Sequence, residues 1–376
     1  MPAERAYLDW NASAPLRPEG RQALLDALDR FGNPSSPHRE GREARALLES
    51  SREEVAGFLG CEPSEVVFTS GGTEANNLAL RSLASAAQTR SWASTRLEHR
   101  SVLRPLEALS RGGRRACWLE AGEDGRAEAA GLDSGVGFGV VQAANQETGA
   151  VQPLEDFRQM FEGLGVPWHC DAVQAWGRIH LRAAEIGCAT ASLSAHKLGG
   201  PKGVGALYVR RGTPMDPILL GGPQERERRA GTENLAGIAS LAAVCRAAAA
   251  DWEGDARWAA GLRDRAVSGA KEIFPLLWEN GPKAPHLRLP NTANLSFPGL
   301  EGEVLVQALD LEGVAVSAGS ACASGALEPS HVLRAMGLPD WRVKSAIRVS
   351  LGPATAAEDI DRFLAALGRV VQRLAK

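Results

Sequence analysis

Short apolar runs alternate with amphipathic stretches from about residue 16 to residue 250. The apolar runs, rich in β-branched and aromatic residues, are typical of buried strands, whereas the amphipathic stretches have helical spacing. We predict strands at 65–69, 136–143, 166–173, 189–194 and 204–209, with helices at 73–87 and 153–164. Such alternation predicts a mostly parallel sheet covered by helices on both faces, with ligands bound at the carboxyl ends of the strands.

The pattern changes after residue 250. A long amphipathic stretch is followed by a strand near 294–297, a helix over 301–311, a strand near 314–318, a strand-like run at 345–352 and a final helix from residue 356. This order predicts a smaller α+β domain of about 120 residues after the large α/β domain.

Composition and charge restrict the classes of function. The chain has 376 residues, a formal charge of −3 and interspersed acidic and basic residues, so we expect no nucleic-acid partner. No apolar run approaches the ~18 residues of a membrane span, and the first residues lack the pattern of a signal peptide, so we expect no membrane association. Six scattered cysteines without a C-x-x-C pair indicate neither disulfides nor a zinc site. A reducing, cytoplasmic setting fits this cysteine usage best.

Lysine is rare in this chain, which has six lysines and 36 arginines. The first two, Lys197 and Lys202, lie in SLSAHKLGGPKGVG, directly after a predicted strand. Unlike arginine, a lysine can deprotonate and form an imine with a carbonyl group. Pyridoxal phosphate enzymes require such a lysine and an acidic partner for the pyridine nitrogen, and Asp171 in HCDAVQ is a candidate for that partner. A surface lysine and a turn-capping aspartate remain the alternative.

The segment SGGTEANN predicts a site for the cofactor phosphate. It joins a strand to a helix that begins near Thr73, and helix N-termini present free amides to phosphate. Ser194 and His196 flank Lys197 and could add donors. Taken alone, the segment is more typical of an ordinary helix start than of a phosphate site. The glycines at 135–139 lack the dinucleotide-binding spacing, and we expect them inside a strand.

Three further residues are candidates for chemistry. His99 in RLEHRSV could stack on a cofactor ring or transfer protons, although a structural role is the alternative. Cys322 in SAGSACASG lies among small residues, which indicates a thiol on a mobile, accessible loop rather than a core position. Arg348 in SAIRVSLG lies in a strand-like run and would bind an anion, either a substrate carboxylate or a structural partner.

Together these motifs resemble those of the cysteine desulfurases of the NifS/IscS type, which are fold-type I pyridoxal phosphate enzymes of the class V aminotransferase group. The resemblance covers nearly the whole chain and includes YLDWNASAP, FGNPSSPHREG, VVFTSGGTEANNLAL, NQETG, HCDAVQ, GGPQERERRAGTEN and VSAGSACASGALEPSHVLRAMG. It implies a large cofactor-binding domain at 14–252 with a mostly parallel seven-stranded sheet flanked by helices. Residues 1–13 and 253–376 would form the small α+β domain, which carries the mobile Cys322 loop.

The resemblance also implies roles for twelve residues. Lys197 would bind pyridoxal 5'-phosphate covalently, Asp171 would pair with its ring nitrogen, Gln174 would bind its ring hydroxyl, and His99 would stack on the ring and transfer protons. Gly72, Thr73, Ser194 and His196 would hold its phosphate, which Thr232 of the other subunit of a homodimer would also reach. Asn145 and Arg348 would hold the substrate carboxylate, and Cys322 would be the nucleophile.

The implied reaction converts L-cysteine to L-alanine and leaves the sulfur on Cys322 as a persulfide. A sulfur-acceptor protein would then receive it, for iron–sulfur clusters or for thio-cofactor or tRNA sulfur supply. A selenocysteine lyase, a cysteine or cystine lyase, a fold-type I aminotransferase and a non-catalytic sulfur carrier are the alternatives. The chain departs from the family pattern at Ser13-Ala14 and at Pro353. The resemblance assigns no role to Lys202.

Overall fold

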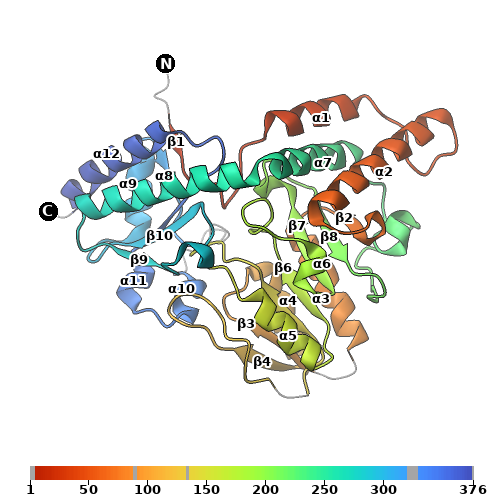
Figure 1. The fold of residues 1–376 in the computed structure, drawn as a ribbon, viewed down its shortest axis with the longest axis horizontal. Helices are drawn as coiled ribbons and strands as arrows, with labels where there is room; N and C mark the ends of the chain where they lie inside the picture. Colours follow the sequence, from red (N-terminus) through yellow and green to blue (C-terminus); the bar gives the residue numbers. More distant parts are fainter. Residues whose placement is uncertain (1–4, 88–90, 133–134, 320–328, 375–376) are drawn as a thin grey trace.

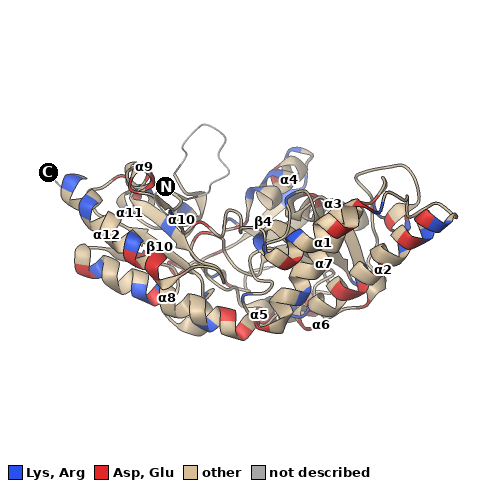
Figure 2. Cartoon of the chain, turned by 90° about the horizontal axis from the view of Figure 1, so that it is seen from above, with Lys and Arg blue, Asp and Glu red and all other residues tan. Residues whose placement is uncertain are grey.

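The computed structural model describes residues 5–87, 91–132, 135–319 and 329–374, so Cys322 lies outside the described residues. The chain forms a larger part built on a seven-stranded sheet and a smaller part that contains both ends of the chain (Figure 1). Lys and Arg are interspersed with Asp and Glu along the outer helices (Figure 2).

The large sheet has the strand order β2-β8-β7-β6-β5-β3-β4. All neighbouring strands are parallel except β8, which runs antiparallel to both β2 and β7. The prediction of a mostly parallel seven-stranded sheet is therefore confirmed. The strands are β2 (Val66–Thr69), β3 (Ser91–Thr95), β4 (Arg115–Leu119), β5 (Gly139–Gln142), β6 (Trp168–Asp171), β7 (Thr190–Ser194) and β8 (Gly205–Val209).

Helices cover both faces of this sheet, because successive strand residues point to opposite faces. In β5, Val140 packs in one core with side chains of α3 (Gly72–Ala86) and α4 (Arg100–Arg111). Its neighbour Val141 packs in another core, with α2 (Arg39–Leu59), α5 (Leu154–Gly163) and α7 (Leu235–Ala250). Helix α1 (Pro18–Leu28) packs on α7, and the short α6 (Ala183–Ile186) precedes β7.

The smaller part has its own hydrophobic core, which joins Ala6 and Leu8 to residues between 262 and 371. It holds an antiparallel sheet of order β12-β10-β9 and a parallel pair of β1 with β11. Its strands are β1 (Ala6–Tyr7), β9 (Trp278–Asn280), β10 (Thr292–Ser296), β11 (Val314–Ala315) and β12 (Ala346–Ser350). Its helices are α8 (Trp252–Ile273), α9 (Gly302–Leu311), α10 (His331–Ala335), α11 (Asp340–Lys344) and α12 (Ala357–Leu374). This separate core supports the domain division at residues 13 and 252, which stays a prediction.

One sequence expectation about the glycines at 135–139 is wrong in detail. Only Gly139 belongs to β5, whereas residues 137 and 138 reach β3 through two backbone hydrogen bonds before the strand begins. Gly139 is required there, because a Cβ at this position would lie 2.2 Å from the ring of Phe161.

Among the described residues, no single helix has the length and apolar character needed to cross a membrane. Helices α7 and α8 reach that length and apolar character only when they are taken together, and they are bent by 75° relative to each other.

Candidate active site

A cavity of about 310 Å³ opens where the carboxyl ends of β5, β6 and β7 meet the starts of α3 and α4 and residues of the smaller part. This is the edge of the sheet at which the strand pattern predicted a ligand site. The cavity wall includes nine of the twelve residues assigned by resemblance: Gly72, Thr73, His99, Asp171, Gln174, Ser194, His196, Lys197 and Arg348.

Lys197 ends a short 3₁₀ turn that follows β7. Its Nζ donates hydrogen bonds to the backbone oxygens of Asn11 at 2.6 Å and Ala12 at 2.8 Å. The N-terminal segment comes this close because Gly199 has a φ of +86°, and a Cβ there would lie 3.1 Å from the oxygen of Pro15. Gly199 therefore serves this close approach of the N-terminal segment.

Asp171 is the last residue of β6, and its side chain is nearly buried. Its carboxylate accepts hydrogen bonds from Asn76 Nδ2 at 2.8 Å, Ser192 Oγ at 3.2 Å and the Val173 amide at 3.2 Å. Three donors, from α3, β7 and the turn after β6, fix its orientation toward the cavity, which suits a carboxylate that must meet one ring nitrogen.

The amide of Gln174 has one possible orientation. Its Oε1 accepts a hydrogen bond from Arg178, which can only donate, and its Nε2 donates to the oxygen of Asn11 at 3.1 Å, which can only accept. Burial lowers the pKa of Arg178 to about 10, so its side chain is still a cation at neutral pH. The second hydrogen of Gln174 Nε2 is thus the donor that the cavity can use.

The start of α3 forms a cradle for an anion. Its N-cap is Gly71, with a φ of +146° and no side-chain cap, so the first amides of the helix remain available to a ligand. A Cβ on Gly72 would lie only 2.7 Å from Val173, so the position admits no side chain without movement. Burial and the neighbouring Lys197 lower the pKa of His196 to about 4, so its ring is a neutral hydrogen-bonding group.

His99 is the N-cap residue of α4. Its Nδ1 lies 2.7 Å from the hydroxyl and 3.1 Å from the amide nitrogen of Ser101, which fixes the position of the ring. Burial lowers the pKa of His99, and this effect outweighs the opposing influence of Asp171.

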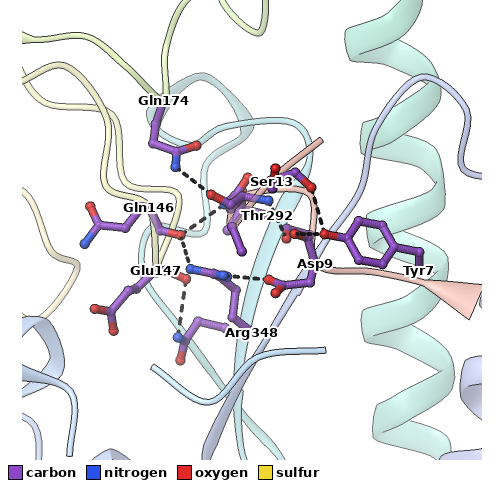
Figure 3. A network of polar contacts seen from close by, with 12 residues as sticks. Tyr7, Asp9, Ser13, Gln146, Glu147, Gln174, Thr292 and Arg348 are labelled. Atoms are coloured by element: carbon purple, nitrogen blue, oxygen red, sulfur yellow. Dashed lines mark hydrogen bonds and ion pairs between the residues drawn. The ribbon is translucent and has the colours of Figure 1, made fainter. Parts of the chain in front are cut away.

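Arg348 lies in the middle of β12 and is 2% exposed. Its guanidinium pairs with Asp9 at 2.6 Å and donates to the backbone oxygen of Gln146 at 3.1 Å (Figure 3). Its Nε is buried without a hydrogen-bond partner among the described residues. The structural ion pair expected as one alternative is present, and Arg348 also lines the cavity, so its role toward a substrate carboxylate stays a prediction.

The model of the family described as Aminotransferase class-V matches residues 6–363. This chain belongs to that family. A cysteine desulfurase of Cereibacter sphaeroides is 44% identical over 381 residues, covering 99% of this chain and 97% of the relative. Cysteine desulfurase IscS of Dictyoglomus turgidum is 39% identical over 375 residues, covering 98% and 95%.

Solved structures of the same architecture are similar over nearly the full chain. A NifS-like protein superposes with a TM-score of 0.92 at 32% identity and covers 98% of this chain and 100% of its own. A structure of SspA in complex with cysteine has a TM-score of 0.80 at 29% identity and covers 93% and 100%. The predictions of the family and the fold class are confirmed.

Asn145, the residue expected at the substrate carboxylate, does not reach the cavity wall of this class-V chain. Its Nδ2 donates to the oxygen of Leu97 at 3.1 Å, and its Oδ1 accepts from the amides of Glu147 and Thr148 at 2.9 and 3.0 Å. The side chain therefore closes its own turn, as asparagine often does. Its neighbour Gln146 lines the cavity instead, and its buried Nε2 has no partner among the described residues. Asparagine commonly accepts hydrogen bonds from the backbone two or three residues on. This tendency is the sequence signal that could have assigned Asn145 to the turn and Gln146 to the cavity.

The structure does not test the roles of two other expected residues. Thr232 is exposed and lies outside the cavity, and Cys322 lies outside the described residues, so their roles stay predictions. Lys202 is exposed at the turn after the glycines. Sequence reasoning did not identify Asn11 or Asn76, which also line the cavity, because their polar roles depend on contacts between distant segments.

Proposed function

We propose that this chain is a pyridoxal phosphate-dependent cysteine desulfurase that converts L-cysteine to L-alanine and retains the sulfur on Cys322. The observation that carries the proposal is the arrangement of one cavity. Lys197 at the end of β7, Asp171 at the end of β6 and the uncapped start of α3 all face it. The full-length likeness to proteins named cysteine desulfurase supports the choice of reaction.

The donors in this cavity fit the chemistry of the cofactor. Lys197 would hold its aldehyde carbon, Asp171 its ring nitrogen and Gln174 Nε2 its ring hydroxyl. The start of α3 would hold its phosphate together with Ser194 and His196. When bound, pyridoxal phosphate supplies an electron sink for charge that develops at the substrate Cα.

The substrate would be held by the groups at the opposite wall. Arg348 and the unpartnered Nε2 of Gln146 provide a cation and an amide donor for the carboxylate of L-cysteine. The likeness to SspA, whose solved structure is a complex with cysteine, supports a cysteine ligand. The amine of Lys197, once it is free of the cofactor and of the oxygens of Asn11 and Ala12, would take a proton from the substrate Cα.

The sulfur step balances without an external oxidant. The Sγ of Cys322 forms a bond to the substrate sulfur while the bond between that sulfur and the substrate Cβ breaks. The thiol is oxidised to a persulfide, and the Cβ carbon is reduced to the methyl group of L-alanine. A sulfur-acceptor protein then takes the outer sulfur atom.

The assembly and setting are part of the same proposal. Thr232 is exposed on this chain, which supports a role in the phosphate site of a second copy and hence a homodimer. The five cysteines among the described residues form no disulfide, which supports a reducing, cytoplasmic setting. Iron–sulfur clusters, thio-cofactors and thiolated tRNA are the candidate destinations of the sulfur.

Two substitutions test the proposal. Lys197→Ala is expected to lose the visible absorbance of lysine-bound cofactor and all alanine formation. Cys322→Ser is expected to keep that absorbance but to form no persulfide, as measured by mass spectrometry after alkylation. If Cys322→Ser formed alanine from L-cysteine at the wild-type rate, a lyase that does not use a protein thiol would replace the proposal.

A further inference from the structure

We propose that Asn76 is a positioning residue that joins Asp171 to His99 in one hydrogen-bond chain, and that this chain keeps the proton of neutral His99 on Nε2. The inference deepens the proposed function, because it assigns which ring nitrogen of His99 can donate a hydrogen bond at that site. It rests on the contacts of side chains in the described part of the chain.

The amide of Asn76 lies at the centre of this chain and is 1% exposed. Its Nδ2 donates one hydrogen to Asp171 Oδ2 at 2.8 Å and the other to Ser101 Oγ at 2.8 Å. The reverse orientation would turn Oδ1 toward the oxygen of the carboxylate, so Asp171 fixes the amide. Both hydrogens of one NH₂ group are therefore used to orient two elements of the cavity wall.

A buried histidine secures the other side of the amide. Asn76 Oδ1 lies 2.9 Å from His169 Nε2, and His169 Nδ1 lies 2.9 Å from the hydroxyl of Thr190. Because Oδ1 can only accept, His169 must carry its hydrogen on Nε2, and Thr190 then donates to Nδ1. Burial lowers the pKa of His169 to about 4, so this arrangement stays neutral at physiological pH.

Ser101 transmits the arrangement to His99. The Ser101 oxygen accepts from Asn76, so its single hydrogen is left for His99 Nδ1 at 2.7 Å. The Ser101 amide donates to the same nitrogen at 3.1 Å. A hydrogen on Nδ1 would face both of these donors, so the neutral ring carries its hydrogen on Nε2.

The charged groups around His99 are consistent with a neutral ring. Burial lowers its pKa most, and Lys197, His331 and Arg100 lower it further, whereas only Asp171 acts in the opposite direction. In this state the imidazole can donate a hydrogen bond to a group in the cavity through Nε2, but it keeps that hydrogen, because its loss from a neutral ring would leave an imidazolate. It can accept a proton at Nδ1 only after the bonds from Ser101 are broken.

Nitrogen NMR of ¹⁵N-histidine-labelled full-length protein, recorded with and without cofactor, tests this inference. The His99 signals are assigned from their loss in His99→Gln. We expect a protonated Nε2 and an unprotonated Nδ1 in the wild-type chain. In Ser101→Ala the tautomers should mix, and the proton affinity of His99 should rise roughly tenfold, as expected for the loss of one hydrogen bond to its neutral form. Asn76→Ala should act in the same direction.

Controls distinguish this role from general support of the fold. Ser101→Thr keeps the hydroxyl and should restore the wild-type tautomer, and the exposed His180 should give unchanged signals in every variant. An Nδ1-protonated His99 in the wild-type chain, or a titration unchanged by Ser101→Ala, would overturn the inference. The cofactor-free measurement needs no turnover, so failure of the desulfurase proposal would leave this result interpretable.

Discussion

Substitution of Arg348 by lysine tests the substrate site most directly. The guanidinium pairs with Asp9 at 2.6 Å, donates to Gln146 O at 3.1 Å and keeps a buried Nε without a partner among the described residues. A lysine ammonium can replace one of these contacts but not the planar fork that spans them. We therefore expect weaker binding of L-cysteine and a less stable chain.

The size of each effect follows from these contacts. A hydrogen bond to a charged group contributes about 1.5–3 kcal/mol, so loss of one bond to the substrate carboxylate corresponds to about a ten- to hundredfold rise in KM. The loss of one internal contact destabilises the folded state by about 1–3 kcal/mol. Initial rates of alanine formation measure the first effect, and urea unfolding of cofactor-free protein measures the second.

Arg288 provides a matched control. It is also buried, pairs with a carboxylate at 2.6 Å (Glu279), donates to a backbone oxygen at 3.0 Å (Thr292) and has a buried Nε without a partner among the described residues. It does not line the cavity. Arg288→Lys should therefore destabilise the chain by a similar amount and leave KM unchanged. Equal KM values for Arg348→Lys and Arg288→Lys would refute a carboxylate role for Arg348.

Two further predictions concern stability and cofactor binding. Burial raises the pKa of Glu98 to about 8, so between pH 4.5 and about 8 the folded chain keeps a proton that the unfolded chain releases. Stability should fall as the pH rises through this window, and Glu98→Gln should flatten the fall in urea denaturation. Gly72→Ala should weaken cofactor binding about tenfold in an absorbance titration, because its Cβ would lie 2.7 Å from Val173. Gly57→Ala, with open space around its Cβ, is the control and should bind normally.

Local sequence patterns were sufficient for much of the large sheet. The predicted strand at 204–209 is β8, and the predicted helix at 73–87 is α3, shifted by one residue. These elements combine clear apolar runs with glycine turns, so local signals and tertiary packing agree. Strand β4 was not predicted from the pattern, because its apolar run is short and begins directly after the charged Arg115.

The candidate site was predictable only where a motif carries its own chemistry. Lys197 lies just after a strand, Asp171 ends one, and both lie at the cavity, as expected. Asn145 and Gln146 show the limit of prediction from sequence. They are adjacent amide side chains, and only the closed turn decides which one faces the cavity. The role of Asn76 depends on His169 and Asp171 from another strand, so a single segment contains no signal for it.

The N-terminal segment has a consequence for the order in which this protein is made. Its residues touch Lys197 through the oxygens of Asn11 and Ala12, and its Asp9 holds Arg348, 339 positions later in the chain. A ribosome synthesises the strand that contains Arg348 only after every strand of the large sheet. The large sheet can fold before that moment, but the substrate wall cannot. The nascent chain should therefore acquire its cofactor pocket before its substrate site.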